Sequence, residues 1–340
     1  MEDIKQRKQD HIKIVMSGAA QHGLPTGFDR VAFVHNAMPE IDFDEIDLSI
    51  DFLGRHLNVP FLASSMTGGP AASGKINYAI AEAAQELGFA MAVGSQRIAL
   101  TTEHDHGLNL ELRKLAPDIP IYSNLGAVQL VHSLGVDDAK RAVEAIGANA
   151  LILHLNPLQE VLQDGGDRKW FGVERAIAAL VRGVQFPVIV KEVGAGISVD
   201  VARRLVQCGI DSIDVAGAGG TSWAAVEGQR AGETGDQALG EIFRNWGLPT
   251  PLCIEDIHLA FPNLPLIASG GIRNGLDGAK AIRLGASLVG QAGSLLPVAI
   301  KGTDAVIDHV RLWAKALQIA CFATGSRSLA DLRAAKLQPV

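Results

Sequence analysis

The chain has 340 residues, of which 48% are hydrophobic and 5% aromatic, and its formal net charge is −7. This length allows either two ordinary domains or one (β/α)8 barrel of about 250 residues with additions, and the hydrophobic content suffices for a large core. The negative net charge argues against a general binding surface for nucleic acids or acidic membranes.

Residues 1–55 are predicted to form an N-terminal extension outside the main fold. A polar, helix-like segment opens it, lacks the apolar core of a signal peptide, and carries Arg7 and Lys8 beside His11. An acidic stretch follows over residues 40–51. Alone, the basic cluster is typical of a solvated helix face, but a phosphate-bearing ligand would give it a binding role.

Eight short apolar segments recur through the rest of the chain, and each is typical of a strand buried on both faces. They cover residues 60–63, 90–93, 120–123, 150–153, 187–190, 212–215, 265–268 and 287–290. Eight strand–helix units predict an α/β protein with a closed (β/α)8, or TIM, barrel over residues 56–340. The whole chain, 1–340, is then one domain, and a doubly wound open sheet is the alternative.

Helix-like stretches rich in Ala, Leu and Glu separate most of these strands. They cover residues 77–87, 137–146, 173–181, 199–206 and 275–284. Ser198 and Asp137 are predicted to cap two of these helices at their N-termini. Glycines predicted to end helices are Gly88, Gly147, Gly209 and Gly285.

A long insertion is predicted between the sixth and seventh strands, from Ser222 to about Pro262. Long insertions at the catalytic face of a barrel often serve as lids or subunit contacts. The cysteines, Cys208, Cys253 and Cys321, show neither metal-site nor disulfide spacing, and no apolar run approaches the roughly 18 residues of a membrane span. A reducing, cytoplasmic setting fits best.

The fourth predicted strand runs directly into the polar segment His154-Leu155-Asn156-Pro157-Leu158-Gln159-Glu160. The carboxyl ends of parallel strands are where α/β proteins bind ligands. Burying such groups without partners would cost about 1–3 kcal/mol each, so a ligand, a metal or a polar network should meet them. Glu160 is a candidate metal ligand or general acid/base, and a lone carboxylate fits Mg²⁺ shared with a substrate phosphate. By itself, His154 could equally be a satisfied core histidine.

Glycine-rich motifs follow the last two strands. Ser269-Gly270-Gly271-Ile272-Arg273 and Gln291-Ala292-Gly293 match the phosphate site of many barrels, with Thr221 beside them. Lys191, after an apolar strand, could form a Schiff base or neutralise a bound anion. Neutral groups of the type that lines a heterocycle are Thr67, Ser95 and Asn124.

The motifs occur in an order that resembles a known family. They are Arg7-Lys8-x-Asp10-His11-Ile12, Ser65-Met66-Thr67-Gly68-Gly69, Gly94-Ser95-Gln96-Arg97, His154-x-Asn156-x-x-Gln159-Glu160, Gly219-Gly220-Thr221-Ser222-Trp223 and Ser269-Gly270-Gly271-Ile272-Arg273. Over about residues 5–333, the chain resembles the type 2, flavin-dependent isopentenyl-diphosphate Δ-isomerases. The Gly-Gly-Ile-Arg motif is shared with many FMN barrels, whereas the His-x-Asn-x-x-Gln-Glu and Arg-Lys-x-Asp-His motifs are far more specific.

The resemblance implies that isopentenyl and dimethylallyl diphosphate are interconverted by a 1,3-allylic proton shift in isoprenoid biosynthesis. It implies reduced FMN as acid/base, with flavin N5 the leading proton carrier, NADPH as reductant, Mg²⁺, and a homo-oligomer, tetramer or octamer. The implied substrate contacts are Arg7, Lys8, His11, Ser95, Gln96, Arg97 and Gln159. The implied FMN contacts are Ser65, Met66, Thr67, Ser95, Asn124, Lys191, Thr221, Gly271, Ile272, Arg273, Ala292 and Gly293. The implied catalytic set is Gln159, Glu160, His154, Asn156 and Lys191, with Glu160 also the metal ligand.

Three other functions remain open from the residues. A 2-hydroxy-acid oxidase needs a histidine base after the seventh strand, but His258 precedes that strand. An IMP-dehydrogenase-like enzyme needs a nucleophilic cysteine after the sixth strand, where this chain has Thr221 and Ser222. A flavin-binding protein without catalysis would not need the Arg7–Lys8 cluster or the Gln159–Glu160 pair.

Overall fold

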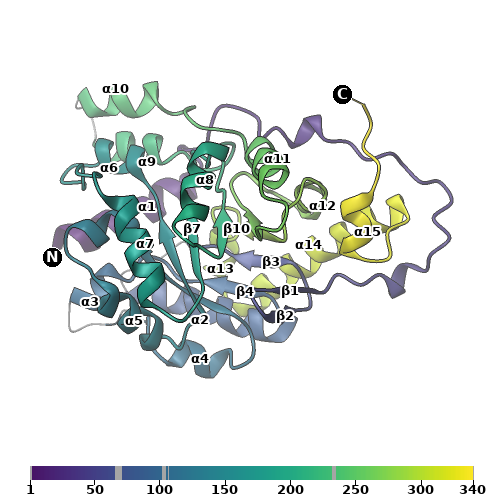
Figure 1. Cartoon of the computed structure of the whole chain (residues 1–340), viewed down its shortest axis with the longest axis horizontal. Coiled ribbons are helices and arrows are strands. Elements are labelled where there is room, and N and C mark those ends of the chain that lie inside the picture. Colours follow the sequence, from purple (N-terminus) through teal and green to yellow (C-terminus); the bar gives the residue numbers. More distant parts are fainter. Residues whose placement is uncertain (1, 66–70, 102–104, 106, 232–234, 340) are drawn as a thin grey trace.

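A closed barrel of parallel strands forms the centre of the protein (Figure 1), in a computed structural model that describes residues 2–65, 71–101, 105, 107–231 and 235–339. Its strands are β3 (Phe61–Ala63), β4 (Ala90–Ala92), β5 (Ile121–Gly126), β6 (Ala150–His154), β7 (Val188–Lys191), β8 (Ser212–Asp214), β9 (Leu266–Ala268) and β10 (Leu288–Gln291). Each strand pairs with the next, and β10 closes onto β3 with Val289 opposite Phe61. The predicted (β/α)8 barrel is confirmed, and the open sheet is not formed.

The predicted helices are present in the connections between the strands. They are α2 (Ala71–Leu87), α5 (Val136–Ala145), α7 (Val173–Gly183), α8 (Val199–Gln207) and α12 (Gly275–Arg283). The further elements are α3 (Arg97–Thr101), α4 (Glu111–Leu115), η3 (Ala127–Val131), α6 (Pro157–Leu162), α13 (Leu296–Ala299), α14 (Thr303–Thr324), α15 (Leu329–Ala334), η1 (Phe28–Arg30) and η2 (Phe43–Glu45).

One of the two predicted helix caps is confirmed and the other is wrong. The Ser198 hydroxyl accepts a hydrogen bond from the Val201 N–H at 3.3 Å, as an N-cap should. Helix α5 begins before Asp137, so the capping carboxylate is Asp138, which accepts from the Gly135 N–H at 2.9 Å. The four predicted helix-ending glycines all adopt positive φ, the left-handed conformation that glycine allows without a Cβ clash.

An antiparallel hairpin, β1 (Ile50–Phe52) and β2 (Arg55–Leu57), closes one end of the barrel and was not predicted. Phe52 and Leu57 are buried against side chains from the strand starts, including Ala90, Ala150 and Leu288. In the sequence, Phe52 and Leu57 stand among acidic and other polar residues, so no apolar run marks the hairpin. Because the hairpin plugs the amino end, only the opposite, carboxyl end of the barrel is left for a site.

Helix α1 (Glu2–Ser17) lies beside the predicted insertion, whose helices are α9 (Trp223–Arg230), α10 (Gly235–Ile242) and α11 (Thr250–Ala260) (Figure 1). The chain after α1 pairs with the β8–α9 loop, because the Ser222 N–H donates to the Ala20 carbonyl at 2.8 Å and Gln21 bridges Thr221. Arg244 also donates to the Ala19 and Gln21 carbonyls. The insertion therefore holds the N-terminal helix at the carboxyl end of the barrel.

No helix in the described part of the chain has the length and apolar character needed to cross a membrane. All three cysteines are free and buried. Burial raises the pKa of Cys253 and of Cys321 to about 12, so both remain uncharged thiols at neutral pH. A thiolate nucleophile is therefore not supplied by either residue.

Candidate active site

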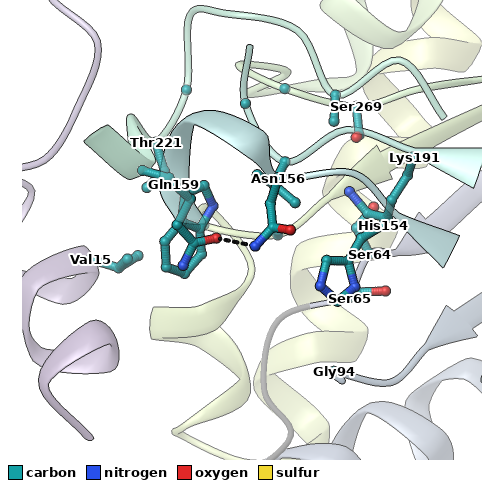
Figure 2. Close-up of a pocket in the computed structure, with 18 of the residues that line it drawn as sticks. Val15, Ser64, Ser65, Gly94, His154, Asn156, Gln159, Lys191, Thr221 and Ser269 are labelled. Atoms are coloured by element: carbon teal, nitrogen blue, oxygen red, sulfur yellow. Dashed lines mark hydrogen bonds between the residues drawn. The ribbon is translucent and has the colours of Figure 1, made fainter. Parts of the chain in front are cut away.

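A cavity of about 350 Å³ opens at the carboxyl end of the barrel, between the strand ends and α1. Figure 2 shows Val15 on one side, Gln159 and Asn156 in the middle, and Lys191, His154 and Ser65 on the other. Among the predicted site residues, those that line it are Arg7, Lys8, His11, Ser65, Ser95, Arg97, Asn124, His154, Asn156, Gln159, Glu160, Lys191, Thr221, Gly271, Ile272, Arg273, Ala292 and Gly293.

Three predicted residues do not appear in that lining. Met66 and Thr67 lie outside the described residues. The Gln96 side chain is buried behind the wall, where it donates to the Ala142 carbonyl at 2.9 Å and accepts from the Ser123 hydroxyl at 2.5 Å. Its oxygen also accepts from the backbone N–H of Asn124 at 3.2 Å. With both ends of its amide engaged, Gln96 is placed to support Asn124 rather than to contact a ligand.

The polar segment after β6 forms a connected network around Asn156. Its amide donates to Gln159 Oε1 at 3.1 Å, the bond drawn in Figure 2, and to Glu160 Oε1 at 2.9 Å. The other Glu160 oxygen accepts from the Asp167 N–H at 2.7 Å. Helix α6 creates this arrangement, because Pro157 starts it and the residues that follow turn back over the strand end. The buried Glu160 carboxylate is thus rigidly held at the cavity wall.

His154 is a neutral hydrogen-bonding residue in this site. Its Nδ1 lies 2.8 Å from Asn124 Oδ1, and the Asn124 amide donates to the Ser65 hydroxyl at 2.7 Å. Burial, together with the positive charges of Lys191 and Lys8, lowers the pKa of His154 to about 3. The imidazole is therefore uncharged at neutral pH, and Nδ1 carries the hydrogen that Asn124 accepts.

A second carboxylate, Glu227, reaches the site from α9. Its Oε1 lies 3.0 Å from both Gln159 Nε2 and His11 Nε2, and its Oε2 accepts from Arg230 at 2.8 Å. Burial opposes ionisation of Glu227, but hydrogen bonds from His11, Gln159 and Arg230 outweigh it and hold its pKa below the ordinary value. Sequence reasoning missed this residue, although a charged glutamate inside the small apolar run after Trp223 was an available signal.

Lys191 lies at the end of β7 with its ammonium buried. Its Nζ donates to the Glu192 carbonyl at 2.6 Å and lies 3.7 Å from Asp214 Oδ2. Asp214 is completely buried and also accepts from the Ser269 hydroxyl at 2.6 Å. The Lys191 side chain is therefore held at the cavity wall by a backbone carbonyl and a buried carboxylate.

Besides Lys191 and Arg273, three further residues with cationic side chains line the same cavity, Arg7, Lys8 and Arg97. Arg7 and Lys8 come from α1, and Arg97 comes from the start of α3, where it donates to Asp167 Oδ2 at 3.0 Å. Lys8 Nζ is buried and has no hydrogen-bond partner among the described residues. Burial and the neighbouring Arg7 charge lower the pKa of Lys8 to about 8. A buried ammonium without a partner is costly, so an anionic ligand fits this position.

The glycine loops after β9 and β10 supply a second group of candidate anion-binding residues at the cavity. In the described structure, the backbone N–H groups of Gly271, Ile272, Ala292 and Gly293 line the cavity and donate to no protein acceptor. Gly271 has a φ of +72°, and a Cβ on Gly293 would lie 3.0 Å from Thr221 Oγ1. Backbone N–H groups that have no protein acceptor, in a glycine-rich loop where few side chains block the approach, can come close enough to hydrogen-bond to a phosphate group.

The described residues contain no cluster of three or more His, Cys, Asp or Glu side chains that could enclose a metal ion. Glu160 is nevertheless a buried carboxylate that lines the cavity with Arg97 and Lys8. Of these three residues, Glu160 alone can supply an oxygen ligand, so it fits Mg²⁺ only if most of the other ligands come from water and from a phosphorylated substrate, which is the usual way proteins hold this ion.

The chain is similar to proteins of known name over nearly its whole length. Residues 155–339 match the FMN-dependent dehydrogenase family. This chain is 55% identical to an isopentenyl-diphosphate delta-isomerase of Xanthobacter autotrophicus, and the match covers 96% of this chain and 95% of that protein. The identity is 56% to the enzyme so named from Stutzerimonas stutzeri (97% and 96% covered) and 46% to that from Synechocystis sp. (98% and 95% covered).

A solved structure of a mandelate oxidase variant covers 95% of this chain, with 94% of its own chain matched. The TM-score is 0.67 and the sequence identity 19%, so this likeness establishes the barrel fold alone. The full-length identities and the flavoprotein family match together give the assignment. The chain belongs to the isopentenyl-diphosphate delta-isomerase family.

Proposed function

We propose that this protein interconverts isopentenyl and dimethylallyl diphosphate on reduced FMN. The proposal is supported by one cavity that is lined by two separate groups of residues suited to binding anions. The backbone N–H cradle at Gly271 and Gly293 suits a cofactor phosphate, and the cluster of Arg7, Lys8 and Arg97 suits a substrate diphosphate. A flavin-binding protein without catalysis would leave the second site without a purpose.

FMN is the proposed cofactor, with NADPH as the source of reducing equivalents. The cradle would hold its phosphate, Lys191 would neutralise negative charge on its ring, and Ser65, Ser95 and Asn124 would hydrogen-bond to it. Met66 and Thr67 belong to the same proposed set, as do Thr221, Ile272, Arg273 and Ala292. When bound in its reduced form, FMN would supply an electron-rich ring and a proton-exchanging N5 beneath the isoprenyl group.

The substrate diphosphate is proposed to bind Arg7, Lys8 and Arg97, with Mg²⁺ held by Glu160 and the phosphate oxygens. Clamping the charged end leaves the small apolar tail positioned over the reacting face of the cavity. His11, Ser95 and Gln159 line the same cavity. We assign Gln96 a supporting role behind Asn124, because its amide oxygen and nitrogen both hydrogen-bond to the protein there.

The proton shift passes through a state with positive charge on the substrate tail. The ionised Glu227 carboxylate places negative charge beside Gln159 and so would stabilise that state. The Gln159 amide is held at both ends, by Asn156 and by Glu227, and this fixes its orientation. An amide is a poor acid, so we assign Gln159 an orienting role. Neutral His154 can donate or accept hydrogen bonds without adding charge.

We also propose that residues 1–340 act as one unit and assemble as a homo-oligomer, a tetramer or octamer. Helix α1 contributes cavity residues, so the extension cannot be separated from the barrel's site. Exposed Ile242 and Trp246, at and just after α10, provide apolar surface for a subunit contact.

The free, buried cysteines fit a reducing compartment, for which we propose the cytoplasm.

The proposed function is tested by anaerobic incubation of the protein with FMN, NADPH, Mg²⁺ and isopentenyl diphosphate, followed by product analysis. We expect dimethylallyl diphosphate to form only when the flavin is reduced. Bound flavin without isomerisation would contradict the proposal and leave a flavin oxidoreductase or a binding protein.

Substrate affinity is expected to weaken as the pH rises above about 8. A bound diphosphate favours the protonated Lys8, whose pKa in the free protein is about 8, so binding takes up a proton once Lys8 has lost it. The Kd for isopentenyl diphosphate should then rise about tenfold per pH unit until the pKa of Lys8 in the complex is reached. Isothermal titration calorimetry of the FMN-loaded protein between about pH 7 and about pH 10 measures this slope.

The matched control is Lys8→Arg, which keeps the positive charge but does not deprotonate in this range. The variant should show a flatter pH dependence than the wild type. Equal slopes in the two proteins would assign the effect to another group.

A further inference from the structure

The loop between α6 and α7 carries an acidic residue, Asp167, that hydrogen-bonds to two residues of the proposed substrate site, Arg97 and Glu160. Its carboxylate oxygen Oδ2 accepts a hydrogen bond from Arg97 Nη1 at 3.0 Å and another from Gln129 Nε2 at 3.2 Å. Its backbone N–H donates to Glu160 Oε2 at 2.7 Å. One residue therefore joins a cation of the proposed diphosphate clamp to the proposed metal ligand.

We propose that Asp167 is a positioning residue for the diphosphate: its carboxylate sets the Arg97 guanidinium and its backbone N–H sets the Glu160 carboxylate. The inference rests on the proposed function, because it concerns how the same cavity holds its substrate. Asp167 does not itself line the cavity, whereas its partners Arg97, Gln129 and Glu160 do, and the proposed effect on the diphosphate runs through Arg97 and Glu160.

The loop is rigid enough to transmit such a constraint. The Trp170 indole N–H donates to the Asp167 carbonyl at 2.8 Å, and His132 Nε2 lies 3.0 Å from the Lys169 carbonyl. Gly166 lets the loop pass against α6, because a Cβ there would overlap the Glu160 backbone carbonyl. These contacts hold Asp167 independently of Arg97, so the carboxylate is a fixed point to which the arginine attaches.

Arg97 needs such a fixed point. Its side chain is 44% exposed, and a long exposed arginine must lose rotamer freedom before it can grip a phosphate. The bond to Asp167 uses Nη1, and the other guanidinium N–H groups have no hydrogen-bond partner among the described residues, so the diphosphate can accept from them. By fixing Arg97 in the free protein, Asp167 lowers the conformational entropy that the arginine loses when the substrate binds. Its own side chain, at 24% exposure, is partly shielded from solvent.

The experiment compares Asp167→Asn with Asp164→Asn in the FMN-loaded protein. Asp164 lies in the same loop, is exposed, and does not line the cavity, so it controls for the loss of one negative charge. We expect Asp167→Asn to raise the KM and the Kd for isopentenyl diphosphate about tenfold, with kcat and FMN affinity within about twofold of wild type. The Asp164→Asn variant should match wild type in all four quantities.

A double-mutant cycle with Arg97→Gln tests the route of the effect. If Asp167 acts through Arg97, the Asp167→Asn change should raise the Kd by much less in the Arg97→Gln background. Asp167→Glu, which keeps the charge, should recover part of the affinity. An unchanged Kd in Asp167→Asn, or an equal increase with and without Arg97, would overturn the inference.

Binding of inorganic pyrophosphate with Mg²⁺ keeps this test separate from the proposed function. If the protein does not isomerise isopentenyl diphosphate but Asp167→Asn still weakens pyrophosphate binding, the function fails and the positioning role stands. If the wild type isomerises but Asp167→Asn binds both ligands normally, the function stands and the positioning role fails.

Discussion

Replacing Glu160 by glutamine is expected to lower kcat by about a hundredfold or more while FMN remains bound. Glu160 is buried, and its two oxygens accept hydrogen bonds from Asn156 and from the Asp167 N–H. Glutamine has the same shape but no charge for Mg²⁺, and its NH₂ group would have to face one of these two donors. Steady-state kinetics and the visible absorbance of bound flavin measure the two parts of this expectation.

The control for this change is Glu144→Gln, which removes the same charge from the exposed face of α5. It should leave kcat, the Mg²⁺ requirement and the flavin content unchanged. Normal turnover in Glu160→Gln would refute the metal-ligand assignment, and loss of FMN from that variant would show a wider structural role.

Replacing Lys191 by methionine is expected to destabilise the protein by about 3 kcal/mol and to remove activity. Asp214 is completely buried, and Lys191 is the cation 3.7 Å from its Oδ2. Removing the ammonium leaves an uncompensated carboxylate inside the barrel, and it also removes the proposed counter-charge for reduced FMN. Chemical denaturation of the flavin-free protein measures the first effect, and turnover of the reconstituted enzyme measures the second.

The two effects separate in the double variant Lys191→Met with Asp214→Asn. Asparagine can still accept the Ser269 hydroxyl hydrogen bond through its oxygen, and no buried charge remains. We expect this variant to regain most of the lost stability while staying inactive. Recovery of activity along with stability would mean that Lys191 serves only to balance Asp214.

The barrel could be predicted because its signal is local and repeated. Each strand is a short apolar run, and a strand that is covered by helices on one side and by the barrel interior on the other must be apolar on both faces. The hairpin of β1 and β2 could not be found in this way. Its two buried anchors are Phe52 and Leu57, and their burial depends on strand ends that lie far along the chain.

The site could be predicted in part, wherever its residues stand at strand ends. Asn156, Glu160 and Lys191 follow buried strands, so parallel packing alone was enough to bring them to one rim. Glu227 and Asp167 belong to a helix and a loop with no such marker, and only the packing of α9 and α6 brings them to Gln159 and Glu160.

The barrel, the set of polar strand ends and the family resemblance follow from the amino-acid sequence, because they depend on residue types at short, regular spacing. Which side chains contact one another became evident from the folded structure. It placed the Gln96 amide behind the cavity wall and buried Lys8 Nζ with no hydrogen-bond partner among the described residues. It also joined the Glu160 and Glu227 carboxylates through Asn156 and Gln159. Such contacts depend on side-chain directions and on the docking of distant segments, and sequence spacing specifies neither.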